Sequence, residues 1–237
     1  MSLDFLEWDS ELFGIKIGKI LHFTSFEEFE QIISYARENQ YKLIYCFADP
    51  SNVAANEVYS AFGKLVDRKV TYYRNIEQKD YSLPLNVVEY TEGTVTEELY
   101  ALALQSGAYS RFKIDTNFPH GSFEKLYRKW IENSVNKTFA EKIYVYKADH
   151  SIKGILILKR KENIGTISLI GVDQSVRGKG IGLALIEAAL HYYSICEVSR
   201  IEAVTQMENH IACKFYEKNN FRIQSIENIY HIWLNKI

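Results

Sequence analysis

The spacing of apolar positions divides the first third of the chain into alternating strands and helices. Residues 12–20 alternate apolar with small or polar side chains, which is typical of a strand with one buried face. Ser25 precedes apolar residues at helical spacing, and Gly63 follows a second, shorter helical pattern. The pattern therefore predicts strands over residues 12–20, 41–48 and 65–74 and helices over residues 26–40 and 52–63.

A polar stretch over residues 75–86, which contains Pro84, is the best candidate for a linker. It divides the chain into a smaller N-terminal α/β domain, residues 1–80, and a larger domain, residues 86–237. In the larger domain the pattern predicts strands over residues 87–90, 139–148, 152–160 and 165–172 and helices over residues 96–107 and 123–135, before a helix, strand, helix, strand order to the C-terminus. This order indicates a mixed, mostly antiparallel sheet flanked by helices.

Residues 106–121 fit no regular element, because they are rich in aromatic side chains and are interrupted by glycine and proline. A faint internal echo is also present. Asn52, Ala55 and Tyr59 have the same spacing as a second set, Asn209, Ala212 and Tyr216. Three matches alone leave a duplicated half-domain as a hypothesis.

Composition narrows the class of protein. Of the 237 residues, 47% are hydrophobic and 24% are charged, which is ordinary for a folded globular protein. Twenty-eight basic against thirty acidic residues give a net charge of −2, so no overall field attracts nucleic acid. No stretch approaches the roughly 18 apolar residues of a membrane helix, and the N-terminus lacks the features of a signal peptide. We therefore expect a cytoplasmic protein that binds neither nucleic acid nor membrane.

The cysteines and histidines favour no metal site. The three cysteines are an odd number without C-x-x-C spacing, which predicts reduced packing residues rather than disulfides or zinc ligands. The six histidines include no H-E-x-x-H pattern and no other pair at i, i+4. A metalloenzyme is not expected.

The strongest chemical signal is the glycine-rich segment Arg177–Gly182, between a predicted strand and a predicted helix. Glycine in a first helical turn costs about 1 kcal/mol relative to alanine, so a ligand or another group must approach this backbone closely. Bare amides at a helix start suit a phosphate. Neither the dinucleotide fingerprint nor the P-loop matches the spacing of the glycines. A turn used only for tight packing is the alternative.

The segment Arg177–Gly182, the strand ending at Gly171-Val172, and the later residues Asn209, Ala212, Phe215, Tyr216 and Phe221 together resemble the GNAT superfamily of acetyl-coenzyme A dependent N-acetyltransferases. The resemblance covers roughly residues 90–237. It implies the GNAT acyltransferase fold, with acetyl-CoA as co-substrate. One departure is Asn220, where the family usually has glycine; asparagine tolerates left-handed geometry.

Several roles follow from this resemblance alone. It implies that the coenzyme pyrophosphate is held by Arg177, Gly178, Lys179, Gly180, Ile181 and Gly182. It also implies that the backbone of Ile170 and Val172 contacts the pantetheine arm and the acetyl carbonyl, and that Tyr216 protonates the departing thiolate. The alternative for Tyr216 is an ordinary core aromatic. Asn209 either contacts the coenzyme arm or simply caps a helix.

A narrower likeness extends over the full length. Residues 6–20, 65–73 and 106–119 resemble enzymes of the dTDP-fucosamine acetyltransferase type, which acetylate the 4-amino group of a nucleotide-linked dideoxysugar. This likeness implies that Asp67 is the candidate base, with Asp9 second; a solvated or capping carboxylate is the alternative for both. Arg111 and Lys113 could meet a nucleotide diphosphate, while Phe112 or Phe118 could stack on its base or sugar.

The sequence therefore predicts direct acetyl transfer from acetyl-CoA to a small-molecule amine, in particular an amino sugar linked to a nucleotide. Direct transfer is expected because no cysteine has an activating context. Two alternatives stay open: acetylation of a protein N-terminus or another small amine, and a non-catalytic module that only binds acetyl-CoA. Aromatic residues in the N-terminal part would suit a homodimer.

Overall fold

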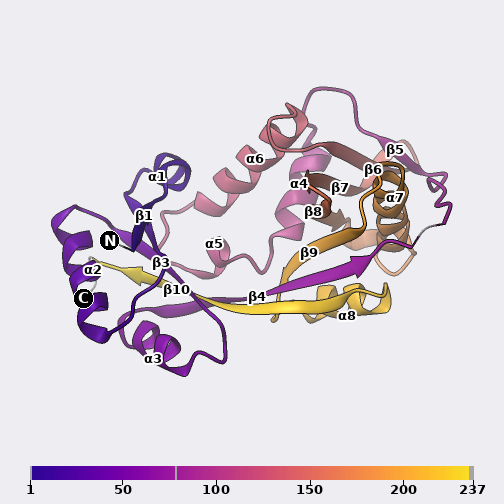
Figure 1. The fold of residues 1–237 in the computed structure, drawn as a ribbon. Coiled ribbons are helices and arrows are strands. Elements are labelled where there is room, and N and C mark those ends of the chain that lie inside the picture. Colours follow the sequence, from indigo (N-terminus) through magenta and orange to yellow (C-terminus); the bar gives the residue numbers. More distant parts are fainter. Residues whose placement is uncertain (1, 78, 235–237) are drawn as a thin grey trace.

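A single sheet of ten strands runs through the computed structural model, which describes residues 2–77 and 79–234 (Figure 1). The strand order is β1-β2-β3-β10-β4-β9-β8-β7-β6-β5. Within the described residues, β2/β3 and β8/β9 pair in parallel and the other seven neighbouring pairs are antiparallel. The expected mixed, mostly antiparallel α/β sheet is therefore confirmed.

The strands are β1 (Leu3–Phe5), β2 (Ile17–Ile20), β3 (Leu43–Ala48), β4 (Lys64–Asn75), β5 (Val87–Glu89), β6 (Lys142–Ala148), β7 (Ser151–Lys161), β8 (Ile164–Val172), β9 (Arg200–Gln206) and β10 (Arg222–Trp233). The α-helices are α1 (Glu7–Phe13), α2 (Phe26–Glu38), α3 (Val53–Phe62), α4 (Glu97–Ser106), α5 (Arg111–Ile114), α6 (Ser122–Val135), α7 (Ile181–Ile195) and α8 (His210–Lys218), with one 3-10 turn, η1 (Gln174–Val176).

Two local expectations are corrected. Of the strand expected over residues 12–20, only Ile17–Ile20 is a strand, β2. The residues before it form helix α1, which ends where Gly14 adopts the left-handed conformation at φ 67°. Within the segment expected to be irregular, residues 106–121, Ser110 starts the one-turn helix α5. Thr96 caps the start of α4, where its hydroxyl accepts a hydrogen bond from the amide of Leu99.

Strands β4 and β10 each extend across both parts of the chain. The C-terminal half of β10, Asn228–Trp233, pairs with β3, while the C-terminal half of β4, Lys69–Asn75, pairs with β9. The two long strands also pair with each other along most of their length and lie along the middle of the molecule in Figure 1. The division into residues 1–80 and 86–237 stays a prediction, and residues 1, 78 and 235–237 lie outside the described part.

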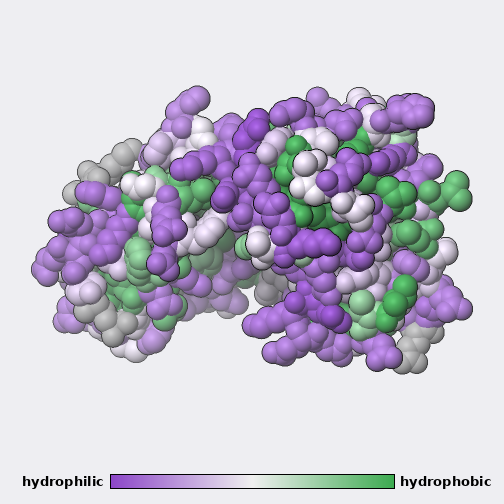
Figure 2. All heavy atoms as spheres, turned by 90° about the horizontal axis from the view of Figure 1, so that it is seen from above, coloured by the Kyte–Doolittle hydropathy of each residue, from purple (hydrophilic) through white to green (hydrophobic). Residues whose placement is uncertain are grey.

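Three apolar clusters cover the sheet. The first packs α1, α4 and α6 against β3 and strands β6 to β8. The second packs α7 and α8 against strands β4, β5, β6, β7, β8 and β9. The third packs α2 and α3 against β2, β3 and β10. No helix in the described part of the chain is long and apolar enough to cross a membrane. Seen from above, the surface is mostly hydrophilic, with apolar side chains exposed in separate small areas (Figure 2).

The internal echo has the same local geometry in both places. Asn52 and Asn209 lie at φ −80° and −81°, and each side chain accepts from the amide three residues later at 3.1 Å. Tyr59 on α3 and Tyr216 on α8 are both 3% exposed. The β3-α3-β4 and β9-α8-β10 units are thus alike in order and in helix capping.

A buried polar cluster fastens the segment after α5 to the end of β10. Asp115 Oδ2 accepts hydrogen bonds from Nδ1 of His231 at 2.6 Å and from Nε1 of Trp233 at 2.8 Å. His231 is 1% exposed and Asp115 is 3% exposed. Because burial disfavours the charged imidazole, it lowers the pKa of His231 to about 4, which outweighs the opposing effect of Asp115.

We expect this histidine to make the fold sensitive to acid. Between the ordinary pKa of 6.5 and the lowered value of about 4, the unfolded chain binds a proton that the folded chain excludes. As the pH is lowered across this interval, the free energy of unfolding should therefore fall. This group contributes up to about 1.4 kcal/mol per pH unit to that fall. Urea unfolding across the interval measures the slope. The His231→Gln variant should show a shallower slope, and an equal slope would contradict the assignment.

Candidate active site

The site begins where two parallel strands separate. Strands β8 and β9 pair over only four positions, Ile164–Ile167 with Arg200–Ala203, although both strands continue beyond them. At the point of separation the β7–β8 register shifts and passes over Ser168, which marks a β-bulge. A bulge bends its strand, so β8 turns away from β9 and the space between them opens.

Main-chain groups of β8 face this opening. The amide of Asp173 donates to the carbonyl of Lys153 on β7 at 2.9 Å. In an antiparallel ladder successive residues alternate between the two sides, so the amides and carbonyls of Ile170 and Val172 point away from β7, toward β9. They lie beyond the last β8–β9 pair and have no ladder partner there. This placement is what the sequence expectation for Ile170 and Val172 requires.

The glycine-rich loop follows directly. Gly178 and Gly180 have φ of +79° and +81°, and a Cβ added at either would meet nothing within 4 Å. Gly180 is the N-cap of α7, a 15-residue helix whose first amides have no side-chain cap. Open space, bare amides and the positive end of the helix dipole together fit an anion such as a pyrophosphate. The loop from Arg177 to Gly182 therefore fits the phosphate role expected of it.

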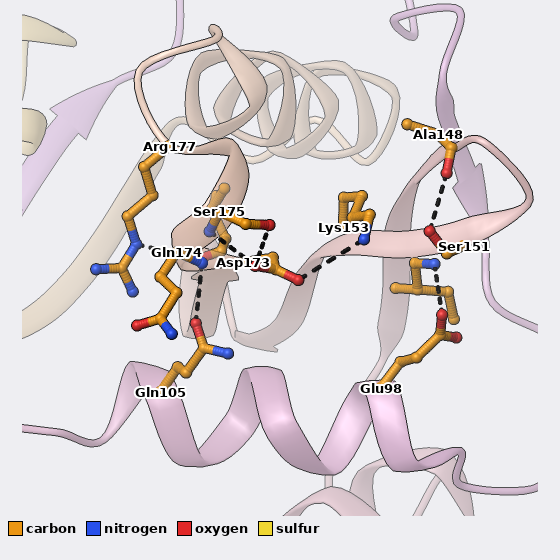
Figure 3. Close-up of polar contacts among 11 residues, drawn as sticks. Glu98, Gln105, Ala148, Ser151, Lys153, Asp173, Gln174, Ser175 and Arg177 are labelled. Carbon is orange, nitrogen blue, oxygen red and sulfur yellow. Dashed lines mark hydrogen bonds and ion pairs between the residues drawn. The ribbon is translucent and has the colours of Figure 1, made fainter.

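Side chains brace the start of this loop (Figure 3). Asp173 accepts from the amide and hydroxyl of Ser175 at 2.9 and 2.7 Å, and Gln105 of α4 accepts from the amide of Gln174 at 3.1 Å. Arg177 Nε donates to the carbonyl of Val172 at 3.1 Å, which attaches this side chain to the end of β8. The loop is thus held in place by hydrogen bonds within the chain.

Gly182 has a different reason to be glycine. A Cβ there would lie 2.9 Å from the ring of Phe215, so α7 and α8 approach each other closely at this point. The alternative of a packing glycine, raised for the whole segment, therefore holds for this position, while Gly178 and Gly180 border open space.

A cavity of about 420 Å³ lies at the opening between β8 and β9. Its walls come from both parts of the chain, including β3, β4, α5, α6, β8, β9 and α8. Among the residues expected to carry function, the cavity is lined by Asp67, Arg111, Phe112, Ile170, Asn209 and Tyr216. Residues far apart in the sequence are therefore brought to one place.

Asp67 lies in the cavity wall on β4, and its side chain is largely buried. The residue is 8% exposed, and its Oδ1 atom is buried without a hydrogen-bond partner. Burial raises the pKa of Asp67 to about 7, with the nearby positive charge of Arg111 acting in the opposite direction. A carboxyl group with a pKa near neutrality can take up and release a proton at working pH.

Tyr216 reaches the same cavity from α8. Its ring stacks on Tyr72 at 5.5 Å and meets the edge of Phe221 at 5.3 Å between centroids. Burial raises the pKa of its hydroxyl, so the group stays protonated and able to donate. Tyr216 thus packs in the core, which was the alternative for this residue, and it also lies in the cavity wall.

Asn209 also lines the cavity, and its side-chain oxygen caps α8 by accepting from the amide of Ala212. The capping alternative is therefore observed, and the residue also lies in the cavity wall.

Arg111 and Phe112 line the cavity, whereas Lys113 does not. The Arg111 guanidinium lies over the rings of Tyr45 and Phe112 at 4.3 and 4.7 Å, and its Nη1 atom is buried without a hydrogen-bond partner. Lys113 is exposed, with its Nζ 5.2 Å from the ring centroid of Phe123. Of the two predicted cations, only Arg111 lies in the cavity wall.

The remaining candidates lie beside the cavity. Asp9 on α1 has a pKa raised by burial, an effect that Arg111 and Tyr45 oppose, and it is outside the cavity wall. Phe118 is buried and packs on Phe13 at 4.8 Å. In the part of the chain that the structure describes, no cluster of three metal-ligating side chains occurs.

Sequence analysis missed several residues of the cavity wall. The most informative is Trp130 on α6, whose Nε1 is buried without a partner beside the cavity. Tyr127, one turn earlier, lines the same wall, and on β9 so does Gln206. Apolar residues at helical spacing usually belong to a core, so nothing in the sequence separated Tyr127 and Trp130 from their neighbours.

Comparison with known proteins defines the class. Residues 105–221 match the model of the acetyltransferase (GNAT) family, so the chain contains a GNAT acetyltransferase domain and is an acyltransferase. Over 231 residues it is 26% identical to the dTDP-fucosamine acetyltransferase of Escherichia coli O6:H1, an alignment that covers 94% of this chain and 95% of that protein.

Two further similarities agree with this class. Over 141 residues the chain is 26% identical to the spore coat polysaccharide biosynthesis protein SpsD of Bacillus subtilis, which is 60% of this chain and 48% of that protein. The structure also resembles the GCN5-related N-acetyltransferase from Sphaerobacter thermophilus, with a TM-score of 0.63 and 14% identity over 98% of this chain and 76% of that one. The expected GNAT fold is confirmed.

The phosphate role of the loop can be tested with a matched pair of glycines. Gly180 and Gly121 are both helix N-caps at φ +81°, and at both positions a Cβ meets nothing within 4 Å. Alanine should strain each backbone by about 1–2 kcal/mol. Gly180→Ala should also weaken acetyl-CoA binding at least tenfold, because its methyl group enters the anion site. Calorimetric titration measures this, and equal affinity in the two variants would remove the loop from the coenzyme site.

Proposed function

We propose that this protein transfers the acetyl group of acetyl-CoA directly to a primary amine, the 4-amino group of a dTDP-linked dideoxy amino sugar. The observation that carries the proposal is the placement of Asp67 and Tyr216 in one cavity at the separation of β8 and β9. A base and an acid are the two groups that such a transfer uses. They come from β4 and α8, which lie far apart in the sequence.

Acetyl-CoA fits the opening on three counts. Gly178 and Gly180 leave space and bare amides for its diphosphate, and Arg177 adds positive charge at the rim. The main-chain groups of Ile170 and the amide of Val172 face the gap through which the pantetheine arm would pass, while the carbonyl of Val172 already accepts from Arg177. Bound there, acetyl-CoA supplies an activated acyl group as a thioester.

The part of the cavity wall that contains Arg111 suits an amine attached to an anion. The Arg111 guanidinium has a buried Nη1 without a partner, and within the described residues it forms no ion pair. A diphosphate would satisfy it with charge-assisted hydrogen bonds. The full-length similarity to an acetyltransferase whose name specifies dTDP-fucosamine supports a nucleotide-linked amino sugar as that acceptor.

In the proposed reaction Asp67 takes the proton of the attacking amine. A new bond forms between the amine nitrogen and the acetyl carbon, and the bond from that carbon to sulfur breaks. Asp67 suits this step because its pKa of about 7 leaves it able to accept a proton near neutral pH. Its Oδ1 atom is buried and has no hydrogen-bond partner among the described residues, so the amine would supply the missing hydrogen bond.

Tyr216 then donates its hydroxyl proton to the departing thiolate. Its stacking on Tyr72 and its edge contact with Phe221 fix the ring, which makes the direction of donation well defined. A tyrosine is a weak acid, so it donates only as negative charge develops on the sulfur. A cytoplasmic location agrees with this proposal, since both acetyl-CoA and sugar nucleotides are found there.

Release of free thiol with a panel of amines tests the proposal. We expect turnover with dTDP-linked 4-amino-4,6-dideoxysugars and little or none with peptides or polyamines. Activity on peptides, together with no activity on any sugar nucleotide, would reject nucleotide-linked amino sugars as the acceptor class. Binding of acetyl-CoA without turnover of any amine would favour the non-catalytic alternative.

The internal echo provides a control for the acid. Tyr216→Phe keeps the ring and removes the donor, so we expect kcat to fall by about 10²-fold with unchanged binding of acetyl-CoA. Tyr59→Phe makes the same change at the equivalent position of the other unit, outside the cavity, and should leave kcat unchanged. Equal rates in the two variants would show that Tyr216 does not act as the acid.

A pH profile tests the base. Because the deprotonated form of Asp67 is active, kcat/KM should fall about tenfold per pH unit below its pKa of about 7. Asp67→Asn should lower kcat/KM by about 10²-fold and flatten this acidic limb. The negative charge of Glu208 contributes to the raised pKa, so Glu208→Gln should move the limb to lower pH. A limb that persists in Asp67→Asn would exclude Asp67 as the base.

A further inference from the structure

The helix that carries Arg111 is too short to hold its own position. Helix α5 spans four residues, Arg111–Ile114, and a single helical turn is unstable in isolation. Ser110 caps its start with a long hydrogen bond of 3.4 Å to the amide of Phe112. Other contacts must therefore fix the Arg111 guanidinium in the cavity wall.

Asp115, directly after this turn, supplies such contacts. Its amide donates to the carbonyl of Arg111 at 2.9 Å, which closes the turn, and its Oδ1 accepts from the amide of Asn117 at 3.1 Å. Its Oδ2 accepts from both His231 and Trp233. These two residues are two positions apart on β10, so both side chains lie on the same face of the sheet.

The charge states make this a strong attachment. Burial alone would raise the pKa of Asp115, yet the hydrogen bonds from His231, Trp233 and Asn117 lower it below its ordinary value. Asp115 is therefore ionised near neutral pH while His231 is neutral and donates from Nδ1. Hydrogen bonds to a buried carboxylate are stronger than those between neutral groups.

A second route connects the cluster to Arg111. The Tyr45 ring stacks on the His231 ring at 4.8 Å and an interplanar angle of 24°. The Arg111 guanidinium lies over the same Tyr45 ring at 4.3 Å. The position of His231 is thus transmitted to Arg111 through an aromatic ring as well as through the backbone of α5.

We propose that Asp115, His231 and Trp233 form a clamp that positions Arg111 to bind the anionic group of the acceptor. Asp115 is then a positioning residue, which acts through Arg111 and touches neither the amine nor the thioester. The inference rests on the proposed function, because it takes Arg111 as the acceptor-binding cation. It adds that acceptor affinity depends on strand β10, whose end pairs with β3 of the N-terminal part.

Steady-state kinetics of the full chain test the clamp. Asp115→Asn should raise KM for the sugar nucleotide about tenfold, with kcat within about twofold of wild type and acetyl-CoA affinity unchanged. Trp233→Phe keeps a ring against Phe118 but removes one hydrogen bond, so a smaller rise of about threefold is expected. Ile32→Val in the α2 core is the control for general loss of stability, and its KM should not change.

A double-mutant cycle decides whether Asp115 acts through Arg111. Once Arg111→Ala has removed the guanidinium, adding Asp115→Asn should raise KM no further. Fold-changes that multiply in the double variant would overturn the clamp. So would a fall in kcat with constant KM in Asp115→Asn, because that pattern assigns Asp115 to the chemical step.

A spectroscopic readout keeps the test independent of the substrate. In the ¹⁵N-labelled chain, the Arg111 Nε–H resonance, identified by its loss in Arg111→Lys, should be displaced by the ring currents of Tyr45 and Phe112. Asp115→Asn should return it toward the position of exposed arginines. An unmoved resonance overturns the clamp even if no sugar nucleotide is acetylated, and a moved resonance without any turnover rejects only the proposed acceptor.

Discussion

The rest of the site depends on one constraint: the parallel strands β8 and β9 pair at four positions and then separate. If the ladder continued, the main-chain groups of Ile170 and Val172 would be satisfied by β9 and no cavity would exist between the strands. The bulge at Ser168 ends the pairing, and the same change of direction leads β8 into the loop before α7. The absence of ladder pairing at Ile170 and Val172, the cavity and the open start of α7 thus share one origin.

The long paired strands β4 and β10, which extend across both parts of the chain, determine which residues share the cavity. Asp67 precedes the predicted linker and Tyr216 follows it, yet the pairing of β4 with β9 places both at the same opening. The helices that precede the two similar units, α2 and α7, differ at their starts. Helix α2 is capped by Ser25, and Glu28 accepts from the amide and hydroxyl of Thr24, so side chains of the protein itself occupy that turn. Helix α7 starts at Gly180 and leaves its amides open.

Local patterns in the sequence predicted most of the helices and strands, although α1 and α5 were missed, because capping residues, glycines and alternation act over a few positions. Ser25, Asn52, Thr96 and Asn209 all cap helices by hydrogen bonds within three residues. The residues that complete the cavity could not be found in this way. Trp130 has the spacing of a core residue, and Asp115 meets His231 across 116 positions, a pairing that only the sheet order creates. The sequence also could not show that Lys113 lies outside the cavity wall, because this depends on the orientation of the single turn of α5.

The charges around Asp67 make its basicity depend on occupancy of the cavity. Burial raises the pKa of this carboxyl group, and the positive charge of Arg111 limits the rise. An anion bound to Arg111 would offset that charge, so the pKa of Asp67 would rise when the acceptor arrives. Asp67 would then be a stronger base with the amine present than in the free protein. In the proposed reaction, the guanidinium that would bind an anionic acceptor would therefore also adjust the proton affinity of Asp67, and one buried charge would link acceptor recognition to catalysis.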